Sequence, residues 1–160
     1  MRQGLILGLL LPLAGCNVFP TKAYEGPGRP KGELAVLKGG GEGEEYGYRS
    51  LVQPLAVDGV RVREGAYLIS FLPGRRRIEV RETLRLFKGV RTQYCAFDLD
   101  SVARCVYSPK PPSPPSDRQE VWLWNVDMPV AVECSDGAAF SLRAPGICGS
   151  SLLQVQRGTP

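Results

Sequence analysis

The stretch GAYLISFLPGRRRIEVRETLRLF, residues 65–87, contains the clearest structural pattern in this chain. Residues 66–72 form an apolar run, and Pro73–Gly74 then supplies the two residue types that a tight turn prefers. Beyond this turn, apolar and charged residues alternate with the period of two that is typical of a strand. The apolar face carries Ile78, Val80, Leu84 and Leu86, and the polar face carries Arg77, Glu79, Arg81, Thr83 and Arg85. The pattern predicts an up-and-down β-hairpin rather than a helix, with a bulge or strand end where Glu82 interrupts the apolar face.

Further strand patterns lie on both sides of this stretch. Upstream, residues 33–39 predict a buried strand, and residues 48–62 predict two strands joined by a turn at Asp58–Gly59. The glycine-rich, acidic residues 39–47 between them indicate a flexible connection. Downstream, a turn at Asp136–Gly137 separates later strands, which we expect in the apolar runs at 120–126, 129–134, 138–144 and 151–157. The chain is therefore expected to be all-β and mostly antiparallel.

Residues 108–117, SPKPPSPPSD, are rich in proline and predict an exposed, extended loop. The residues after this loop, 118–160, are too few to build an independent hydrophobic core comfortably. We therefore interpret residues 33–160 as a single β domain that contains the loop. A separate subdomain at residues 118–160 is the alternative.

The 160 residues of the chain include no histidine. This excludes Ser-His-Asp and Cys-His catalytic arrangements and every zinc site that uses histidine. Glu44 and Glu45 are interpreted as solvated, and Asp98, Asp100 and Asp117 lack the further ligands of a calcium loop. We therefore expect no catalytic residues, no metal and no cofactor. The enzymatic alternative is a pair of carboxylates that cleaves glycans.

The first fifteen residues have the pattern of a secretory signal. Arg2 gives a positive start, Leu5–Leu13 is almost continuously apolar, and the small residues Ala14 and Gly15 follow. The apolar run is about half of the roughly 20 residues that a membrane-spanning helix needs, and Pro12 interrupts it. We therefore expect residues 1–15 to be a cleaved signal peptide.

Leu13-Ala14-Gly15-Cys16 resembles the lipobox of bacterial lipoproteins. The resemblance implies that the Cys16 thiol carries a diacylglycerol, that the chain is cut before Cys16, and that the new amine is acylated. Two or more acyl chains hold a protein stably to a bilayer. In such lipoproteins an aspartate after the cysteine signals retention in the inner membrane, and Asn17 stands there instead. The resemblance thus implies an outer-membrane anchor, a flexible tether at residues 16–32 and a domain that faces the periplasm.

Four further cysteines, Cys95, Cys105, Cys134 and Cys148, are expected to form two disulfides in an exported chain. A four-thiolate zinc site is the alternative, but the spacing lacks the close cysteine pairs that such sites use. Three pairings are open. We favour Cys95–Cys105 and Cys134–Cys148, because a hairpin with its tip near Asp100 would place Cys95 opposite Cys105.

Two segments resemble known families. VDG at residues 57–59, followed by LPGRRRIEV at residues 72–80, resembles PEGA-like and other small immunoglobulin-like β domains, in which a DG turn and a PG turn bracket a pair of strands. YEGPGRPKGELAVL at residues 24–37 is similar to the start of a family of small, uncharacterised bacterial lipoproteins. Together the resemblances imply an immunoglobulin-like β-sandwich on a lipid anchor.

Two groups of residues are candidates for ligand binding. Arg75, Arg76 and Arg77 could face lipopolysaccharide, lipid headgroups or anionic wall polymers, or they could be the solvated face of an edge strand. Trp122 and Trp124 lie two apart and so point the same way from a strand, either to stack on sugars or into the core.

The chain without its signal carries 19 basic and 16 acidic residues, because only Arg2 is lost. This small excess indicates no nucleic-acid partner. We expect a non-catalytic, lipid-anchored cell-envelope protein with a structural or binding role, in contact with the membrane through its lipid and with an envelope protein or glycan. The alternative is a glycan or lipopolysaccharide binder that uses Trp122, Trp124 and Arg75–Arg77.

Overall fold

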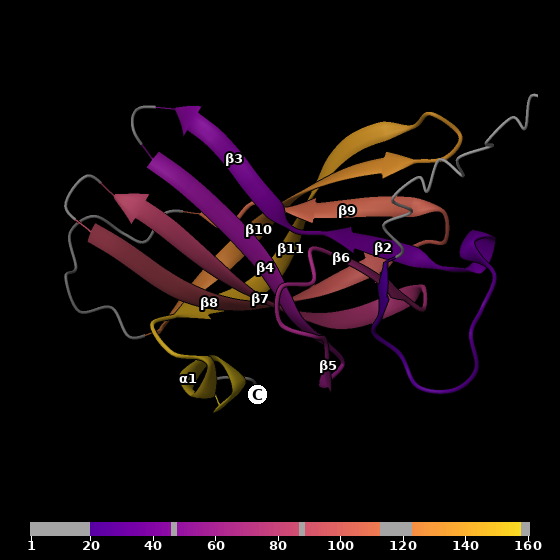
Figure 1. Cartoon of the computed structure of the whole chain (residues 1–160), viewed down its shortest axis with the longest axis horizontal. Coiled ribbons are helices and arrows are strands. Elements are labelled where there is room, and N and C mark those ends of the chain that lie inside the picture. Colours follow the sequence, from indigo (N-terminus) through magenta and orange to yellow (C-terminus); the bar gives the residue numbers. More distant parts are fainter. Residues whose placement is uncertain (1–19, 46–47, 87–88, 113–122, 158–160) are drawn as a thin grey trace, which may run out of the picture.

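The computed structural model describes residues 20–45, 48–86, 89–112 and 123–157, which form an all-β domain (Figure 1). The strands are β1 (Thr21–Lys22), β2 (Ala35–Lys38), β3 (Gly40–Glu45), β4 (Tyr48–Val57), β5 (Val60–Arg61), β6 (Leu68–Phe71), β7 (Gly74–Leu86), β8 (Gly89–Ser101), β9 (Cys105–Pro109), β10 (Leu123–Cys134) and β11 (Ala139–Gly149). A short 3-10 helix, η1 (Lys31–Glu33), precedes β2, and helix α1 (Leu152–Arg157) follows β11. The all-β prediction is confirmed.

All eleven strands belong to one curled, mixed sheet. Its order is β1-β6-β2-β9-β10-β11-β8-β7-β4-β3, and β5 pairs with β4. The β1–β6 and β2–β9 pairs are parallel, and the other pairs are antiparallel. The immunoglobulin-like sandwich is not confirmed, because the described strands make one hydrogen-bonded sheet instead of two stacked ones.

The curl lets distant strands share one hydrophobic core. Phe71 of β6 and Tyr107 of β9 pack with their ring centroids 6.4 Å apart, and both are almost fully buried. Ile78 and Val80 of β7 belong to the same core cluster. β2 and β3 follow each other in the chain, yet β2 pairs with β6 and β9 whereas β3 pairs with β4. The bend at Gly39 therefore links two distant parts of the sheet, β2 near one end and β3 at the other.

The hairpin around Pro73–Gly74 is a wrong prediction. β6 pairs with β1 and β2, whereas β7 pairs with β4 and β8. The chain therefore crosses from one part of the sheet to another after Pro73, and the long hairpin is formed by β7 and β8, in register from Gly74 opposite Ser101 to Leu86 opposite Gly89. The predicted apolar face of β7 is confirmed at Ile78 and Val80, which are fully buried, but Glu79 of the predicted polar face is also buried and accepts a hydrogen bond from Gln156.

The bulge predicted at Glu82 lies elsewhere. Glu82 pairs regularly with Val52 and Gln93, and the register shift is in β4, between Pro54 and Ala56. Proline lacks the backbone N–H that a sheet ladder needs, so within sheets it is found at edges and bulges. Pro54 thus supplies a local reason for the shift, and Glu82 is instead a buried residue in a regular strand.

Two short turns are confirmed. Asp58 and Gly59 have φ values of 48° and 77° between β4 and β5, as a two-residue hairpin turn requires. At the β10–β11 turn, Gly137 has a φ of 88°, and the Ala138 amide donates to Asp136 Oδ1 at 3.0 Å. Both turns depend only on neighbouring residues.

The predicted disulfide pairing is wrong. The structure contains Cys95–Cys148, which joins β8 to β11, and Cys105–Cys134, which joins β9 to β10. Each pair occupies directly facing positions, with Cα atoms 4.1 and 4.0 Å apart. Facing cysteines do pair, as the prediction assumed, but β8 and β9 are not neighbours in the sheet, so Cys95 never faces Cys105.

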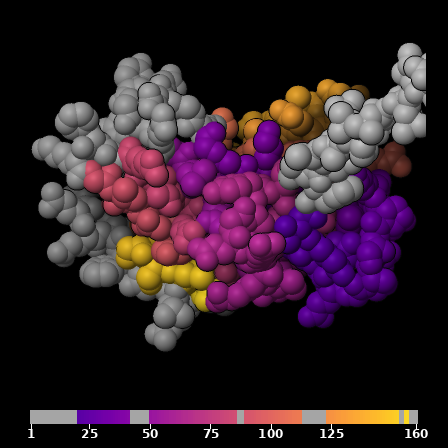
Figure 2. Space-filling model, in the orientation of Figure 1, coloured from indigo at the N-terminus to yellow at the C-terminus, as the bar shows by residue number. Residues whose placement is uncertain are grey.

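Three other predicted segments differ from the structure. Residues 21–22, expected in the tether, form β1, and Ala23 is buried in the core. The expected flexible connection at 39–47 contains strand β3, and the expected strand at 151–157 is helix α1. The helix packs on β8 and β11 through the fully buried Val155. Figure 2 shows it in yellow at the margin of the face that β4 and its neighbours form. Residues 1–19, which include the predicted signal and Cys16, and residues 113–117 of the proline-rich loop lie outside the described residues.

Candidate functional site

The arginine cluster at the start of β7 is held by ion pairs within the domain. Arg75 and Arg77 both reach Asp98, at 3.0 and 3.1 Å. Arg76 pairs with Asp58 at 3.0 Å and also donates to the carbonyls of Leu72 and Pro73. These contacts compensate much of the cluster's charge. The edge-strand interpretation is wrong, because β7 lies between β4 and β8 in the sheet.

The acid at the centre of this cluster is stabilised in its charged form. Partial burial raises the pKa of Asp98, but hydrogen bonds from Arg75 and Arg77, together with their charges, outweigh burial and hold that pKa below its ordinary value. The hydrogen bond to Asp98 and the charges of Asp98 and Asp100 raise the pKa of Arg75. The cluster therefore acts as an internal ion-pair network.

Trp124 lies on the other face of the sheet from Arg75 and Arg77. It is half-buried and packs against the core. Across neighbouring strands Trp124 pairs with Cys148, Cys148 with Cys95, and Cys95 with Val80, so these four side chains share one face of the sheet. Arg75 and Arg77 are an odd number of residues from Val80 and so point to the outer face. Arg75 and Arg77 thus do not form one binding surface with Trp124. Arg76 is in the same phase as Val80, but Asp58 and the carbonyls of Leu72 and Pro73 hold its guanidinium. Trp122 lies outside the described residues.

A pocket of about 400 Å³ opens where β2 separates from β9. β2 pairs with β9 only at Val36–Val106 and Leu37–Tyr107, and from Lys38 onward the chain turns away to form β3. We call this opening the seam pocket. Its lining residues come from the β2–β3 bend, β4, β7 and the end of β9: Lys38, Gly39, Gly40, Gly41, Ser50, Val52, Glu82, Leu84, Ser108, Pro109, Lys110 and Pro111.

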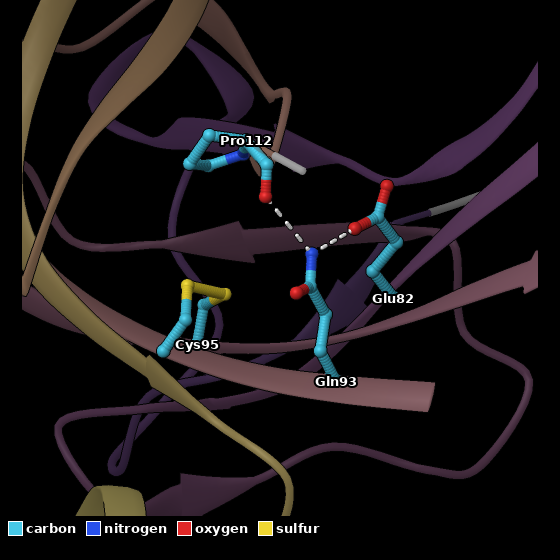
Figure 3. The surroundings of a disulfide bond; sticks show 5 residues. Glu82, Gln93, Cys95 and Pro112 are labelled. Atoms are coloured by element: carbon cyan, nitrogen blue, oxygen red, sulfur yellow. Dashed lines mark hydrogen bonds between the residues drawn. A yellow bond between two sulfur atoms is a disulfide. The ribbon is translucent and has the colours of Figure 1, made fainter. Parts of the chain in front are cut away.

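Glu82 is a buried acid in the lining of the seam pocket, with only 3% of its surface exposed. It accepts hydrogen bonds from Ser50 Oγ and Gln93 Nε2. Gln93 Nε2 also donates to the Pro112 carbonyl at 3.2 Å, so that Gln93 links Glu82 to the segment after β9 (Figure 3). A buried carboxylate is costly unless such donors surround it. The network therefore fixes Glu82 in place.

Gln93 Oε1 is the one buried side-chain nitrogen or oxygen without a hydrogen-bond partner among the described residues. Figure 3 shows this oxygen on the side of the amide that faces Cys95, away from Glu82. The opposite amide orientation would turn the oxygen toward two acceptors, Glu82 and the Pro112 carbonyl, so the observed orientation is the favourable one.

The wall of the seam pocket is formed partly by glycine backbone, and its rim carries lysines. Gly39, Gly40 and Gly41 present backbone without side chains, and the exposed Lys38 and Lys110 bring positive charge to the rim. None of the described lining residues is aromatic, and Glu82 is the only carboxylate among them.

A second, smaller pocket of about 190 Å³ between β4, β5, β7 and Leu152 has charged groups that bind one another. Arg81 contacts Gln53 and lies 3.7 Å from Glu64. Glu79 accepts a hydrogen bond from Gln156 at 3.0 Å. This arrangement ties α1 to the sheet.

Two other kinds of site have no candidate within the described ranges. No group of three cysteine or acidic side chains is arranged to hold a metal ion. No helix there has the length and apolar character needed to cross a bilayer.

Sequence reasoning missed the seam pocket. It interpreted Glu82 as a bulge and residues 39–47 as a flexible connection, and it did not consider Gln93. The sequence does contain a signal of this polar site. Glu82 is two residues from the fully buried Val80, and Gln93 is two residues from the fully buried Cys95, so both polar residues occupy core-facing strand positions. Polar residues in the buried phase of two adjacent strands indicate a polar site.

Neither a protein-family profile, nor a curated protein, nor a solved structure shows a significant match to this chain. The function is therefore inferred from the residues and their geometry.

Proposed function

We propose that this chain is a non-catalytic, lipid-anchored protein of the bacterial cell envelope, and that its β domain binds a ligand through the seam pocket. The observation that carries the binding role is the pocket itself. It combines a buried, hydrogen-bonded carboxylate, a wall of bare backbone and a positively charged rim in about 400 Å³. This volume lies in the range of small-ligand sites.

Export is supported by the two disulfides, because such bonds persist mainly outside the cytoplasm. The lipobox at Leu13–Cys16 supports acylation of Cys16, and Asn17 supports an outer-membrane destination facing the periplasm. An immunoglobulin-like origin of the domain stays a prediction, which the turns at Asp58–Gly59 and Pro73–Gly74 support only at the level of short motifs.

If Cys16 is acylated, the short segment between it and the sheet supports a domain that lies close to the membrane. Four residues separate Cys16 from β1, which begins at Thr21. Four residues span at most about 14 Å when fully extended. An acylated Cys16 would thus hold β1 and the adjacent β6 near the lipid headgroups, and the ligand would be one that is present at the membrane surface.

A binding role is better supported than catalysis. The chain has no histidine, and the seam pocket contributes one carboxylate from its described lining. The alternative glycan or lipopolysaccharide binder is not favoured, because Arg75 and Arg77 are engaged by Asp98 and point away from the face that carries Trp124.

Photo-crosslinking in intact cells tests this proposal. A photoreactive amino acid replaces Ser108 in the seam pocket, and a control replaces Val102, which is 58% exposed and does not line it. We expect a defined adduct from position 108 only, recovered in the outer-membrane fraction and lost from that fraction when Cys16→Ser removes the anchor. Identical adducts from both positions, or no adduct from position 108, would refute a binding role for the pocket.

A further inference from the structure

We infer that two copies of this chain pair with each other along the free part of strand β11, residues 139–145, and so join their sheets across a twofold axis. This inference goes beyond the proposed ligand binding and does not rest on the seam pocket. Three features of the described residues support it: an unpaired strand edge, a half-exposed aromatic side chain on that strand, and opposite charges at its two ends.

β11 is a neighbour of β8 over only part of its length. It pairs with β10 from Ala139 to Gly149, whereas its pairing with β8 is limited to residues 146–149. Pro145 precedes this short ladder and has no backbone N–H with which to extend it. Figure 1 shows the end of the β10–β11 hairpin, in orange, standing apart from β8. The backbone edge of residues 139–145 that faces away from β10 therefore has no partner among the described strands.

The free part of β11 lacks the features that protect an edge strand from pairing. Residues 137–142 include neither a charged side chain nor a proline. At the two ends of the strand order, by contrast, β3 carries Glu42, Glu44 and Glu45, and β1 is two residues long. Charged side chains and short length both discourage edge-to-edge pairing. The free part of β11 is therefore a better template for an added strand than either end of the sheet.

Phe140 extends the apolar row of β11 beyond the part that the core covers. Alternate residues of a strand share a face, so Ala144, Leu142 and Phe140 form one row. Ala144 is 2% exposed and Leu142 packs against the core, whereas Phe140 is 50% exposed. Aromatic side chains are enriched where proteins meet one another. A strand added to this edge would cover the ring.

The ends of the free segment carry opposite charges, which favours a second copy as its partner. Asp136 precedes residues 137–142 and Arg143 follows them, and both side chains are exposed. In an antiparallel pair of identical strands, a twofold axis places one residue opposite its own copy. With Phe140 at this centre, Arg143 of each copy faces Gly137 of the other and lies next to Asp136. Parallel pairing in register would instead bring like charges together.

Both charged groups are available for this contact. Arg143 has five N–H donors, makes one hydrogen bond to the described residues, from Nη1 to the Asp127 carbonyl at 3.3 Å, and forms no ion pair with a described carboxylate. Asp136 accepts the Ala138 amide through Oδ1 and forms no ion pair with a described base. Glu133, which is exposed near the same end of β10, adds a second acid there. Arg143 of one copy thus meets an acidic turn of the other.

The shared ladder is short, so pairing should depend on concentration. It spans residues 138–142 of each copy, far fewer than the about 20–30 residues a side of a standard interface. The acyl anchor proposed at Cys16 would confine both copies to one membrane and raise their effective concentration. The pairing is therefore best tested in the cell envelope.

Photo-crosslinking in intact cells tests the pairing. A photoreactive amino acid replaces Ala139, which is exposed on the free edge, and a control replaces Val90, which is 67% exposed at the far end of β8. We expect an adduct of twice the chain mass from position 139 alone. Digestion and mass spectrometry should locate the link within residues 139–143 of the second copy, because position 139 faces Ser141 in this register.

Two substitutions and a matched control test the contacts. Phe140→Lys removes the ring and places two lysines opposite each other, so the adduct from position 139 should fall about tenfold or more. Phe140→Ser is the milder change if circular dichroism shows that lysine perturbs folding, and Arg143→Gln should lower the yield several-fold. Val90→Lys also replaces an exposed apolar residue by lysine, and it should leave the yield unchanged.

Several results would overturn this inference. They are the absence of a doubled adduct from position 139, an equal doubled adduct from position 90, and a link that maps outside residues 137–145. A yield that both Phe140→Lys and Phe140→Ser leave unchanged would overturn pairing through β11. An adduct that contains a different protein would overturn the second copy as the partner. The proposed ligand binding is tested separately, from position 108, and none of these results would refute it.

Discussion

Replacing Gly39 by alanine should destabilise the domain strongly, although it adds a single methyl group. Gly39 is buried at the bend between β2 and β3, and its amide donates to the Tyr67 carbonyl at 2.7 Å. The new Cβ would lie 2.4 Å from the Val52 carbonyl oxygen and 2.6 Å from Pro54 Cδ. Both distances are well below van der Waals contact, so β2, β3 or β4 must move.

The cost follows from which atoms obstruct the methyl group. The Val52 oxygen is backbone in the middle of β4, where Val52 pairs with both Gly40 and Glu82, so it cannot shift without disturbing two strand pairs. Overpacking of this kind typically costs about 1–3 kcal/mol. We expect the upper end, about 3 kcal/mol, because the obstructing group is not a flexible side chain.

Urea unfolding of the oxidised protein, followed by circular dichroism, measures this loss. With an m-value of about 2 kcal/mol/M, a loss of about 3 kcal/mol lowers the unfolding midpoint by about 1.5 M. Gly41→Ala is the matched control two residues away, where the methyl group meets only ordinary contacts. Replacing a glycine without strain should leave stability unchanged or raise it by about 0.4–1 kcal/mol. Equal midpoints for the two variants would refute the close bend at Gly39.

Three further predictions concern the disulfides, the buried acid and the ion-pair network. Replacing both cysteines of Cys95–Cys148, which are 53 residues apart, by alanine should lower the free energy of unfolding by about 4 kcal/mol, because loop-closure entropy is lost. For Cys105–Cys134, which are 29 residues apart, the same change should cost about 3.5 kcal/mol. Urea unfolding measures both losses, and a larger loss for the shorter loop would contradict this reasoning. Glu82→Ala should cost about 1–3 kcal/mol, because Gln93 Nε2 loses one of its two acceptors and Ser50 Oγ loses its acceptor. An unchanged melting temperature would show that the network contributes little. The folded-state pKa of Asp98 is depressed, so its stabilisation is present above its unfolded pKa, near 4, and is lost as the pH falls through the lower folded value. Asp98→Asn should therefore flatten the fall in stability below about pH 4, and a fall as steep as in the parent protein would refute this role.

The parts of the fold that could be predicted from sequence are those set by neighbouring residues. The turns at Asp58–Gly59 and Asp136–Gly137 follow from local φ preferences, and the alternation along β7 follows from its exposure to a core on one side. The all-β class followed from the same local patterns. None of these required knowledge of which strands are neighbours.

The errors in strand pairing and in the disulfides concern partners that lie far apart in the chain. Pro73–Gly74 does turn the chain, but it delivers β7 to β8 and β4 instead of back to β6. The disulfide prediction failed for the same reason, since the strand that faces Cys95 is β11. Loop closure between distant segments is decided by the packing of the whole core, which local patterns do not encode.

The seam pocket was not predicted from the sequence for two reasons, one local and one long-range. Residues 39–47 have low strand propensity because of their glycines, and pairing with β4 overrides that propensity. Glu82 departs from the apolar alternation because Gln93, on the neighbouring strand, satisfies it. The first could not be predicted from the segment alone, whereas two polar residues in buried phases of β7 and β8 were visible once these strands were paired.

Mass spectrometry of the native protein, intact and after non-reducing digestion, tests the central claim most directly, because export, anchoring and the disulfide-stapled sheet all leave a mass signature. We expect a chain that begins at Cys16 with added acyl mass, and linked peptides that join Cys95 to Cys148 and Cys105 to Cys134. An intact Met1, no acyl mass and free thiols at these four positions would contradict it.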